Sequence, residues 1–143
     1  MAGHRVLLVD DEVEFTAVLS ERLEARGLRV TVVDSGAAAL VQAADRTFDA
    51  IILDLAMPGM DGIETLRRLR AINADLQIIL LTGRATVDLG VEAIKLGAVD
   101  LLEKPANLKD LMARIDVASS RKKELAEQRL DAQLTDILRR KGW

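Results

Sequence analysis

The chain has 143 residues, half of them apolar, with a net charge of −3 and no cysteine. This is the size of one ordinary domain with a hydrophobic core, and it excludes disulfides and thiolate metal sites. The apolar runs are too short to span a bilayer and the N-terminus lacks the pattern of a secretion signal, so we expect a cytoplasmic protein without membrane contact. The charge balance does not favour direct nucleic-acid binding.

Five short apolar segments alternate with stretches of helical character along the first 118 residues. The segments span residues 6–9, 30–33, 50–53, 78–81 and 99–102. They are continuous apolar runs, which are typical of strands buried on both faces of a parallel sheet.

The stretches between these segments carry helical signals. Residues such as Ser35, Asp61 and Asn107 stand where helix N-caps are expected. The apolar residues that recur along the predicted helices are Phe15, Val18, Leu19 and Leu23, then Leu66, Leu69 and Ile72, then Val87, Val91 and Ile94, and finally Leu108, Leu111, Met112 and Ile115. Strands that alternate with helices predict an α/β fold with a doubly wound parallel sheet.

The last part of the chain differs in composition. Residues 121–141 lack proline and glycine and favour helix, with a thin apolar stripe of Leu130, Leu134 and Ile137. We expect a domain over residues 1–118 and a charged, helical extension over residues 119–143. The stripe is read either as part of a solvated tail or as a contact with a partner or a second copy.

Polar residues follow the predicted strands at their carboxyl ends, where open parallel sheets bind ligands. These residues are Asp10, Asp11 and Glu12 after the first strand, Asp54 at the third, Thr82 after the fourth and Lys104 after the fifth.

These side chains suit one kind of chemistry. Asp10, Asp11 and Asp54 would repel one another unless a cation neutralised them, and an all-oxygen site suits Mg²⁺. Thr82 and Lys104 could then hold a phosphoryl group, with Asp54 as the nucleophile. Taken singly, the first two aspartates could be helix caps, the threonine a turn residue and the lysine a surface residue. The combination favours a phosphoryl site.

The chain resembles the receiver domains of response regulators in two-component signalling, over roughly residues 4–118. The matching segments are VLLVDDE at 6–12, ILDLAMPGMDG at 52–62, LTG at 81–83 and LLEKP at 101–105. The resemblance implies a flavodoxin-like fold with strand order 2-1-3-4-5. It is strongest to receivers of transcriptional activators of the nitrogen-regulator type.

The resemblance also implies a role for each residue of the site. Asp54 resembles the phosphoacceptor, Asp11 a direct Mg²⁺ ligand, Asp10 a ligand through water, and Ala56 a ligand through its carbonyl. Since Ala56 has no side chain to position an attacking water, we expect a long-lived phosphoryl group. Arg84 lies at another position that tunes dephosphorylation.

Three further roles follow from the resemblance. Thr82 resembles the switch hydroxyl, and Lys104 the phosphate-binding lysine, whose bond to Pro105 is expected to be cis. Leu101 stands where many receivers have the tyrosine or phenylalanine of the switch. The usual movement of an aromatic ring is therefore not implied, and repacking of Leu101 as the switch residue is the alternative.

The implied function is a phosphorylation-dependent switch that catalyses only its own phosphorylation and dephosphorylation. The phosphodonor would be a histidine kinase, a phosphotransfer protein or a small molecule. Output would occur through partner binding or a homodimer, formed by the face of the fourth helix, fifth strand and fifth helix or by the C-terminal helix. The chain is then either a stand-alone receiver or the N-terminal part of a larger, transcriptional regulator.

Two other classes of protein share part of this pattern. A phosphatase of the haloacid-dehalogenase type would need a second acid two residues after Asp54, where the chain has Ala56. A flavodoxin-like cofactor binder would need a phosphate-binding loop after the first strand and aromatic residues around the ring. The chain has three acids at that loop and only Phe15, Phe48 and Trp143 as aromatics.

Overall fold

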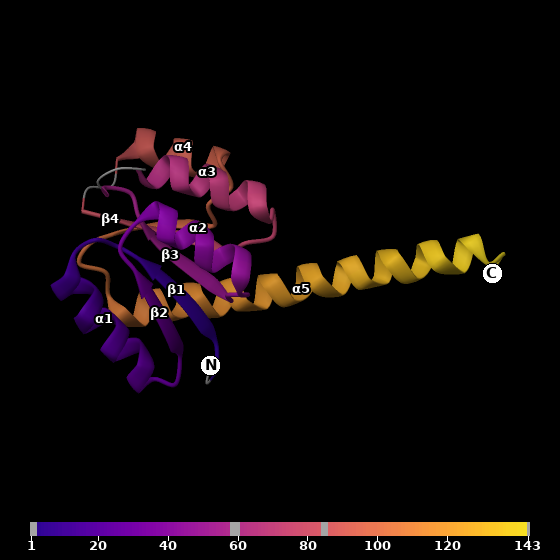
Figure 1. Ribbon diagram of the computed structural model, residues 1–143, viewed down its shortest axis with the longest axis horizontal. Coiled ribbons are helices and arrows are strands. Elements are labelled where there is room, and N and C mark those ends of the chain that lie inside the picture. The colour runs from indigo at the N-terminus through magenta and orange to yellow at the C-terminus, as the bar shows by residue number, and fades with distance from the viewer. Residues whose placement is uncertain (1–2, 58–60, 84–85, 143) are drawn as a thin grey trace.

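The computed structural model describes residues 3–57, 61–83 and 86–142, and within these ranges strands and helices alternate (Figure 1). The elements are β1 (Arg5–Val9), α1 (Val13–Ala25), β2 (Arg29–Val33), α2 (Gly36–Asp45), β3 (Ala50–Asp54), α3 (Gly62–Ile72), β4 (Ile78–Thr82), α4 (Val87–Lys95), β5 (Asp100–Glu103) and α5 (Leu108–Arg140). No helix of this described part is both long and apolar enough to cross a membrane.

The five strands form one parallel sheet in the order β2-β1-β3-β4-β5, which confirms the predicted topology. Helices α2, α3 and α4 cover one face, and α1 and α5 cover the other (Figure 1). Successive strand residues point to opposite faces. In β1, Leu7 packs with the first group of helices and Leu8 with the second. The central strands β1, β3 and β4 are therefore buried on both faces, as the continuous apolar runs predicted, whereas the edge strands β2 and β5 are only partly buried.

The helix starts agree with the predicted caps. The side chains of Ser35, Asp61 and Asn107 accept hydrogen bonds from backbone N–H groups three residues later, at 3.1, 2.8 and 3.2 Å. The start of α3 also needs a residue without a side chain. A Cβ on Gly62 would lie 2.3 Å from the Leu55 Cα, so only glycine lets α3 begin against the end of β3.

Helix α5 continues far beyond the sheet. Its 33 residues correspond to about 50 Å at ~1.5 Å per residue, and the helix has no break near residue 118. Lys122 lies 3.6 Å from Asp49, and Arg129 forms an ion pair with Asp75, so these turns still contact the domain. The C-terminal turns of α5, drawn in yellow, project away from the domain (Figure 1).

Candidate functional site

The candidate site lies at the carboxyl end of the sheet, where the strand order reverses. Strand β1 pairs with β2 on one side and with β3 on the other. The chain therefore runs from β1 to one edge of the sheet at β2, and then returns past β1 to β3. The register of Val9 with Leu53 brings Asp10, directly after β1, next to Asp54 at the end of β3. Both aspartates are 2% exposed. A crevice for a ligand is expected at this point of a doubly wound sheet.

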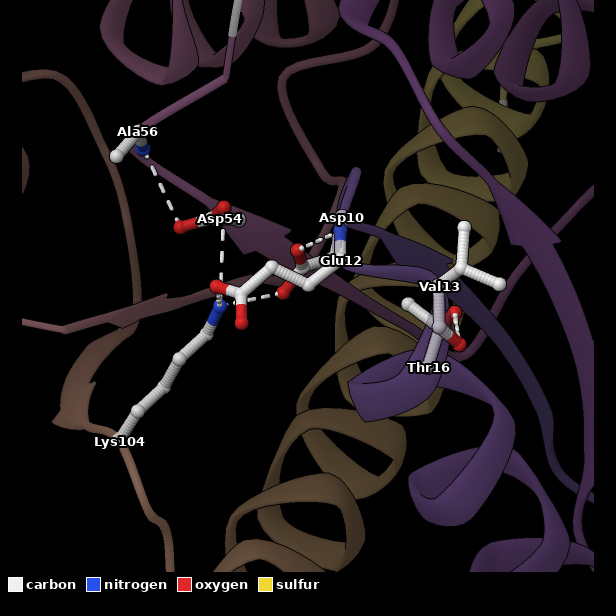
Figure 2. Close-up of polar contacts among 7 residues, drawn as sticks. All are labelled: Asp10, Glu12, Val13, Thr16, Asp54, Ala56 and Lys104. Carbon is white, nitrogen blue, oxygen red and sulfur yellow. Dashed lines mark hydrogen bonds and ion pairs between the residues drawn. The ribbon is translucent and has the colours of Figure 1, made fainter.

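One ammonium group joins the acids of the site. Lys104 Nζ lies 2.6 Å from Asp10 Oδ2, 2.8 Å from Glu12 Oε1 and 3.7 Å from Asp54 Oδ2 (Figure 2). The same ammonium lies 4.5 Å from the centroid of the Phe15 ring, within the range of a cation–π interaction. Lys104 thus reaches from the end of β5 across to the ends of β1 and β3.

Backbone groups fix the orientation of the two aspartates. Asp10 Oδ1 accepts a hydrogen bond of 2.9 Å from the Glu12 N–H, and Asp54 Oδ1 accepts one of 3.2 Å from the Ala56 N–H (Figure 2). Each aspartate therefore turns its other oxygen, Oδ2, toward Lys104.

Burial changes the proton affinity of Asp54. Loss of solvation, reinforced by the nearby Asp10 carboxylate, raises its pKa to about 6, against the opposing effects of the Ala56 N–H and Lys104. For Lys104, burial works to lower the pKa, but hydrogen bonds to Asp10 and Glu12 outweigh it, and the pKa is raised. The lysine therefore stays charged, whereas Asp54 is held near the midpoint of its titration at slightly acidic pH.

The residues present fit a small divalent cation. Asp10, Glu12 and Asp54 each offer a carboxylate oxygen, and these oxygens lie within 4.8 Å of one another. Lys104 supplies the positive charge among them. A set of carboxylate oxygens without histidine or cysteine suits Mg²⁺ better than a softer metal.

The other predicted residues surround this cluster. Asp11 is half-buried and is not part of the cluster of close carboxylate oxygens found among the described residues, where Glu12 stands instead. Thr82 is buried at the end of β4, and Leu101 is half-buried in β5. The Lys104–Pro105 peptide bond is cis. Arg84 lies outside the described residues.

The sequence did not reveal that Glu12 and Phe15 both contact Lys104. Glu12 was noted after the first strand but given no role. It is the N-cap of α1 and makes no side-chain cap bond, so its carboxylate can turn to Lys104. The sequence pattern places Phe15 on one face of the first helix and does not reveal the contact of its ring with the Lys104 ammonium. The sequence does carry one signal for Glu12: it directly follows Asp10 and Asp11 and stands at the N-cap of α1.

Comparison with known proteins identifies the family. The chain is 36% identical over 113 residues to the transcriptional regulatory protein ZraR of Escherichia coli O157:H7, which covers 79% of this chain but only 26% of ZraR. The chain thus spans about a quarter of that relative's length. The expectation that the chain does not bind nucleic acid directly conflicts with its similarity to a transcriptional regulatory protein.

Two solved structures are similar over most of the chain. The receiver domain of the sensor histidine kinase PA1611 from Pseudomonas aeruginosa PAO1, with magnesium in its active-site cleft, is 30% identical, with a TM-score of 0.76, and the match covers 83% of this chain and 99% of that domain. A response regulator of Burkholderia pseudomallei with a phosphorylated aspartic acid, calcium and citrate is 28% identical, with a TM-score of 0.75, covering 97% and 86%. The family model described as response regulator receiver domain matches residues 6–116. The chain therefore belongs to the family of response regulator receiver domains.

Proposed function

We propose that this receiver is a switch operated by phosphorylation of Asp54. The observation that carries the proposal is the buried Asp54 carboxylate, which shares one lysine with Asp10 and Glu12 at the point where the strand order reverses. The magnesium-bound and phosphorylated states of the two similar structures support it.

In the proposed reaction, an oxygen of the Asp54 carboxylate attacks the phosphorus of a phosphohistidine or a small acyl phosphate. A bond from the Asp54 oxygen to phosphorus forms as the bond from phosphorus to the leaving group breaks. Lys104, already 3.7 Å from Asp54, is placed to balance the charge of the transferred group. The chain thus catalyses its own phosphorylation and dephosphorylation and acts on no other substrate.

Mg²⁺ is proposed as the cofactor, held by Asp10, Asp11, Asp54 and the carbonyl of Ala56, with Asp10 acting through water. When bound, it would neutralise acidic oxygens around the transferring phosphoryl group. Glu12, whose carboxylate lies in the cluster, is added to the candidate ligands. Lys104, which now bridges Asp10 and Glu12, would be released from one of them toward the phosphoryl group.

The phosphoryl group adds about −1.5 to −2 charges to the site. Thr82, buried at the end of the strand next to Asp54, is proposed as the hydroxyl that responds. Leu101, on β5 beside β4, would transmit the change through packing with the core instead of through an aromatic ring.

The proposed donor is a cytoplasmic histidine kinase or phosphotransfer protein. Residues 1–118 are proposed as the receiver and 119–143 as its extension, although α5 runs through this boundary unbroken. Since ZraR is a transcriptional regulator, we propose that the signal passes to transcription through parts outside the matched receiver.

The test is incubation with acetyl phosphate and Mg²⁺, followed by intact mass measurement. The wild type should gain one phosphoryl group and Asp54→Asn should gain none. Asp61→Asn, which alters only the cap of α3, should gain the group as the wild type does. An adduct on the Asp54 variant, or on none of the three proteins, would reject the proposal.

A further inference from the structure

The last turns of α5 carry an apolar stripe that no part of the described chain covers. Leu130, Leu134, Ile137 and Leu138 are 65%, 54%, 47% and 40% exposed. Among the described residues, the pair of Arg129 with Asp75 is the ion pair furthest along α5 that joins the helix to the domain. Side chains of this size, exposed in succession on one helix, indicate an interaction surface.

Two opposite charges lie at the ends of this stripe. At 3.6 residues per turn, Glu127 and Lys141 both lie within about 60° of Leu130 around the helix axis. Glu127 comes just before the stripe and Lys141 just after it. Neither side chain forms an ion pair within the described ranges, in contrast to Arg140, which lies 2.9 Å from Asp136.

We infer that this segment of α5, residues 127–141, pairs antiparallel with the same segment of a second copy of the chain. In a parallel pair, Glu127 would face Glu127 and Lys141 would face Lys141, with repulsion at both ends. In an antiparallel pair, each Glu127 lies beside the Lys141 of the other copy, and the two leucine-rich stripes still meet. Charge complementarity thus selects the second copy as the occupant and fixes its direction.

The fold leaves room for such a pair. The stripe lies about 120° around the helix from the buried face formed by Leu111, Ile115 and Ala118. When Leu134 of one helix meets Leu134 of the other, Glu127 of each helix lies opposite Lys141 of its partner. Arg129, which contacts Asp75 of the domain, lies about 140° around the helix from Leu134, so the pair forms away from that contact. The two receivers then stand at opposite ends of the helix pair, related by a two-fold axis, and opposed helix dipoles favour the arrangement.

Light scattering on a sizing column tests the pairing with the full chain. The wild type should change from monomer to dimer with rising concentration. Leu134→Asp should weaken dimerisation by roughly tenfold or more, because the buried leucine is lost and a charge is introduced. Ala132→Asp, on the opposite side of the same helix, should dimerise as the wild type does. Circular dichroism on both variants checks that the helix persists.

Cross-linking tests the direction, because the chain has no cysteine of its own. With a short bis-maleimide, a mixture of Glu127→Cys and Lys141→Cys chains should give cross-linked dimers, and each variant alone should give few. Cross-links within each single variant, and few in the mixture, would show a parallel pair and overturn the inference. A wild type that stays monomeric, or a Leu134→Asp variant that still dimerises, would overturn it as well.

Discussion

The candidate site and the end of α5 both contain ion pairs, but the pairs are buried at the site and exposed at the end of α5. At the candidate site, the Lys104 side chain is 11% exposed and faces two aspartates that are almost fully buried. Near the end of α5, Arg140 and Asp136 also form an ion pair, but their side chains are 70% and 65% exposed. Water solvates each of those charges, whereas at the site the charges depend on one another. A charge change such as phosphorylation therefore has its largest effect at the buried end.

The largest expected effect is the loss of Lys104. Lys104→Met leaves Asp10 and Asp54 buried without their counter-charge, so the free energy of unfolding should fall by about 2–4 kcal/mol without divalent metal. Urea denaturation in EDTA at neutral pH measures it. Arg140→Met, at the exposed pair, is the matched control. If both variants lost the same free energy of unfolding, the buried ion pairs would not matter more to stability than the exposed one, contrary to this account.

Removal of the charge of Asp54 should raise the free energy of unfolding, whereas removal of the charge of Lys104 lowers it. The pKa of Asp54 is raised from its ordinary value of 3.8 to about 6, so between these values the native state binds more protons than the unfolded state. Stability from this group therefore falls as pH rises from about 4 to about 6. Asp54→Asn should stabilise the metal-free protein by about 1–3 kcal/mol at neutral pH, with the gain vanishing near pH 4.

Urea denaturation in EDTA over a series of pH values measures this gain. Asp116→Asn, at an exposed position of α5, is the control and should change stability little at any pH. An Asp54→Asn variant that is less stable than the wild type at neutral pH would contradict the account of the site.

The contact of the Phe15 ring with Lys104 should contribute less to the free energy of unfolding than the buried ion pairs do. A double-mutant cycle of Phe15→Leu and Lys104→Met should give a coupling free energy of about 0.5–1 kcal/mol. The control cycle pairs Lys104→Met with Phe48→Leu, which lies in the core on the other face of the sheet and should show no coupling. Equal coupling in both cycles would argue against a specific interaction with the Phe15 ring.

The smallest effect is expected at the exposed pair of α5. Arg140→Met should lower the free energy of unfolding by no more than about 0.5 kcal/mol, as for exposed ion pairs four residues apart on a helix. The loss should shrink further at high salt. A loss that is large and independent of salt would mean that this end of α5 is less solvated than its exposure indicates.

Much of the fold could be predicted because the sequence patterns are local. The run at residues 50–53 is buried on both sides in β3, and Asp61 caps α3 as its spacing to Glu64 predicted. Asp10 and Asp54 converge because β1 and β3 are neighbours, which the predicted strand order 2-1-3-4-5 requires.

The remainder depends on side-chain positions that no local pattern encodes. Lys104 could reach several acids, and the sequence alone does not show that it lies closer to Asp10 and Glu12 than to Asp54. The ion pair of Arg129 with Asp75 joins residues far apart in the sequence. This ion pair requires α5 to run along the face of the sheet that α1 also covers. Helical propensity does not predict that path.

The central claim is that Asp54 is the residue that accepts the phosphoryl group. Borohydride reduces an acyl phosphate to an alcohol, so the protein treated with acetyl phosphate and Mg²⁺ can be reduced, digested with trypsin and sequenced by tandem mass spectrometry. The peptide of residues 47–67 contains Asp49, Asp54 and Asp61. The account predicts homoserine at position 54 and unchanged aspartate at the other two. Homoserine at position 49 or 61, or at Asp10 or Asp11 in another peptide, with aspartate intact at position 54, would contradict it.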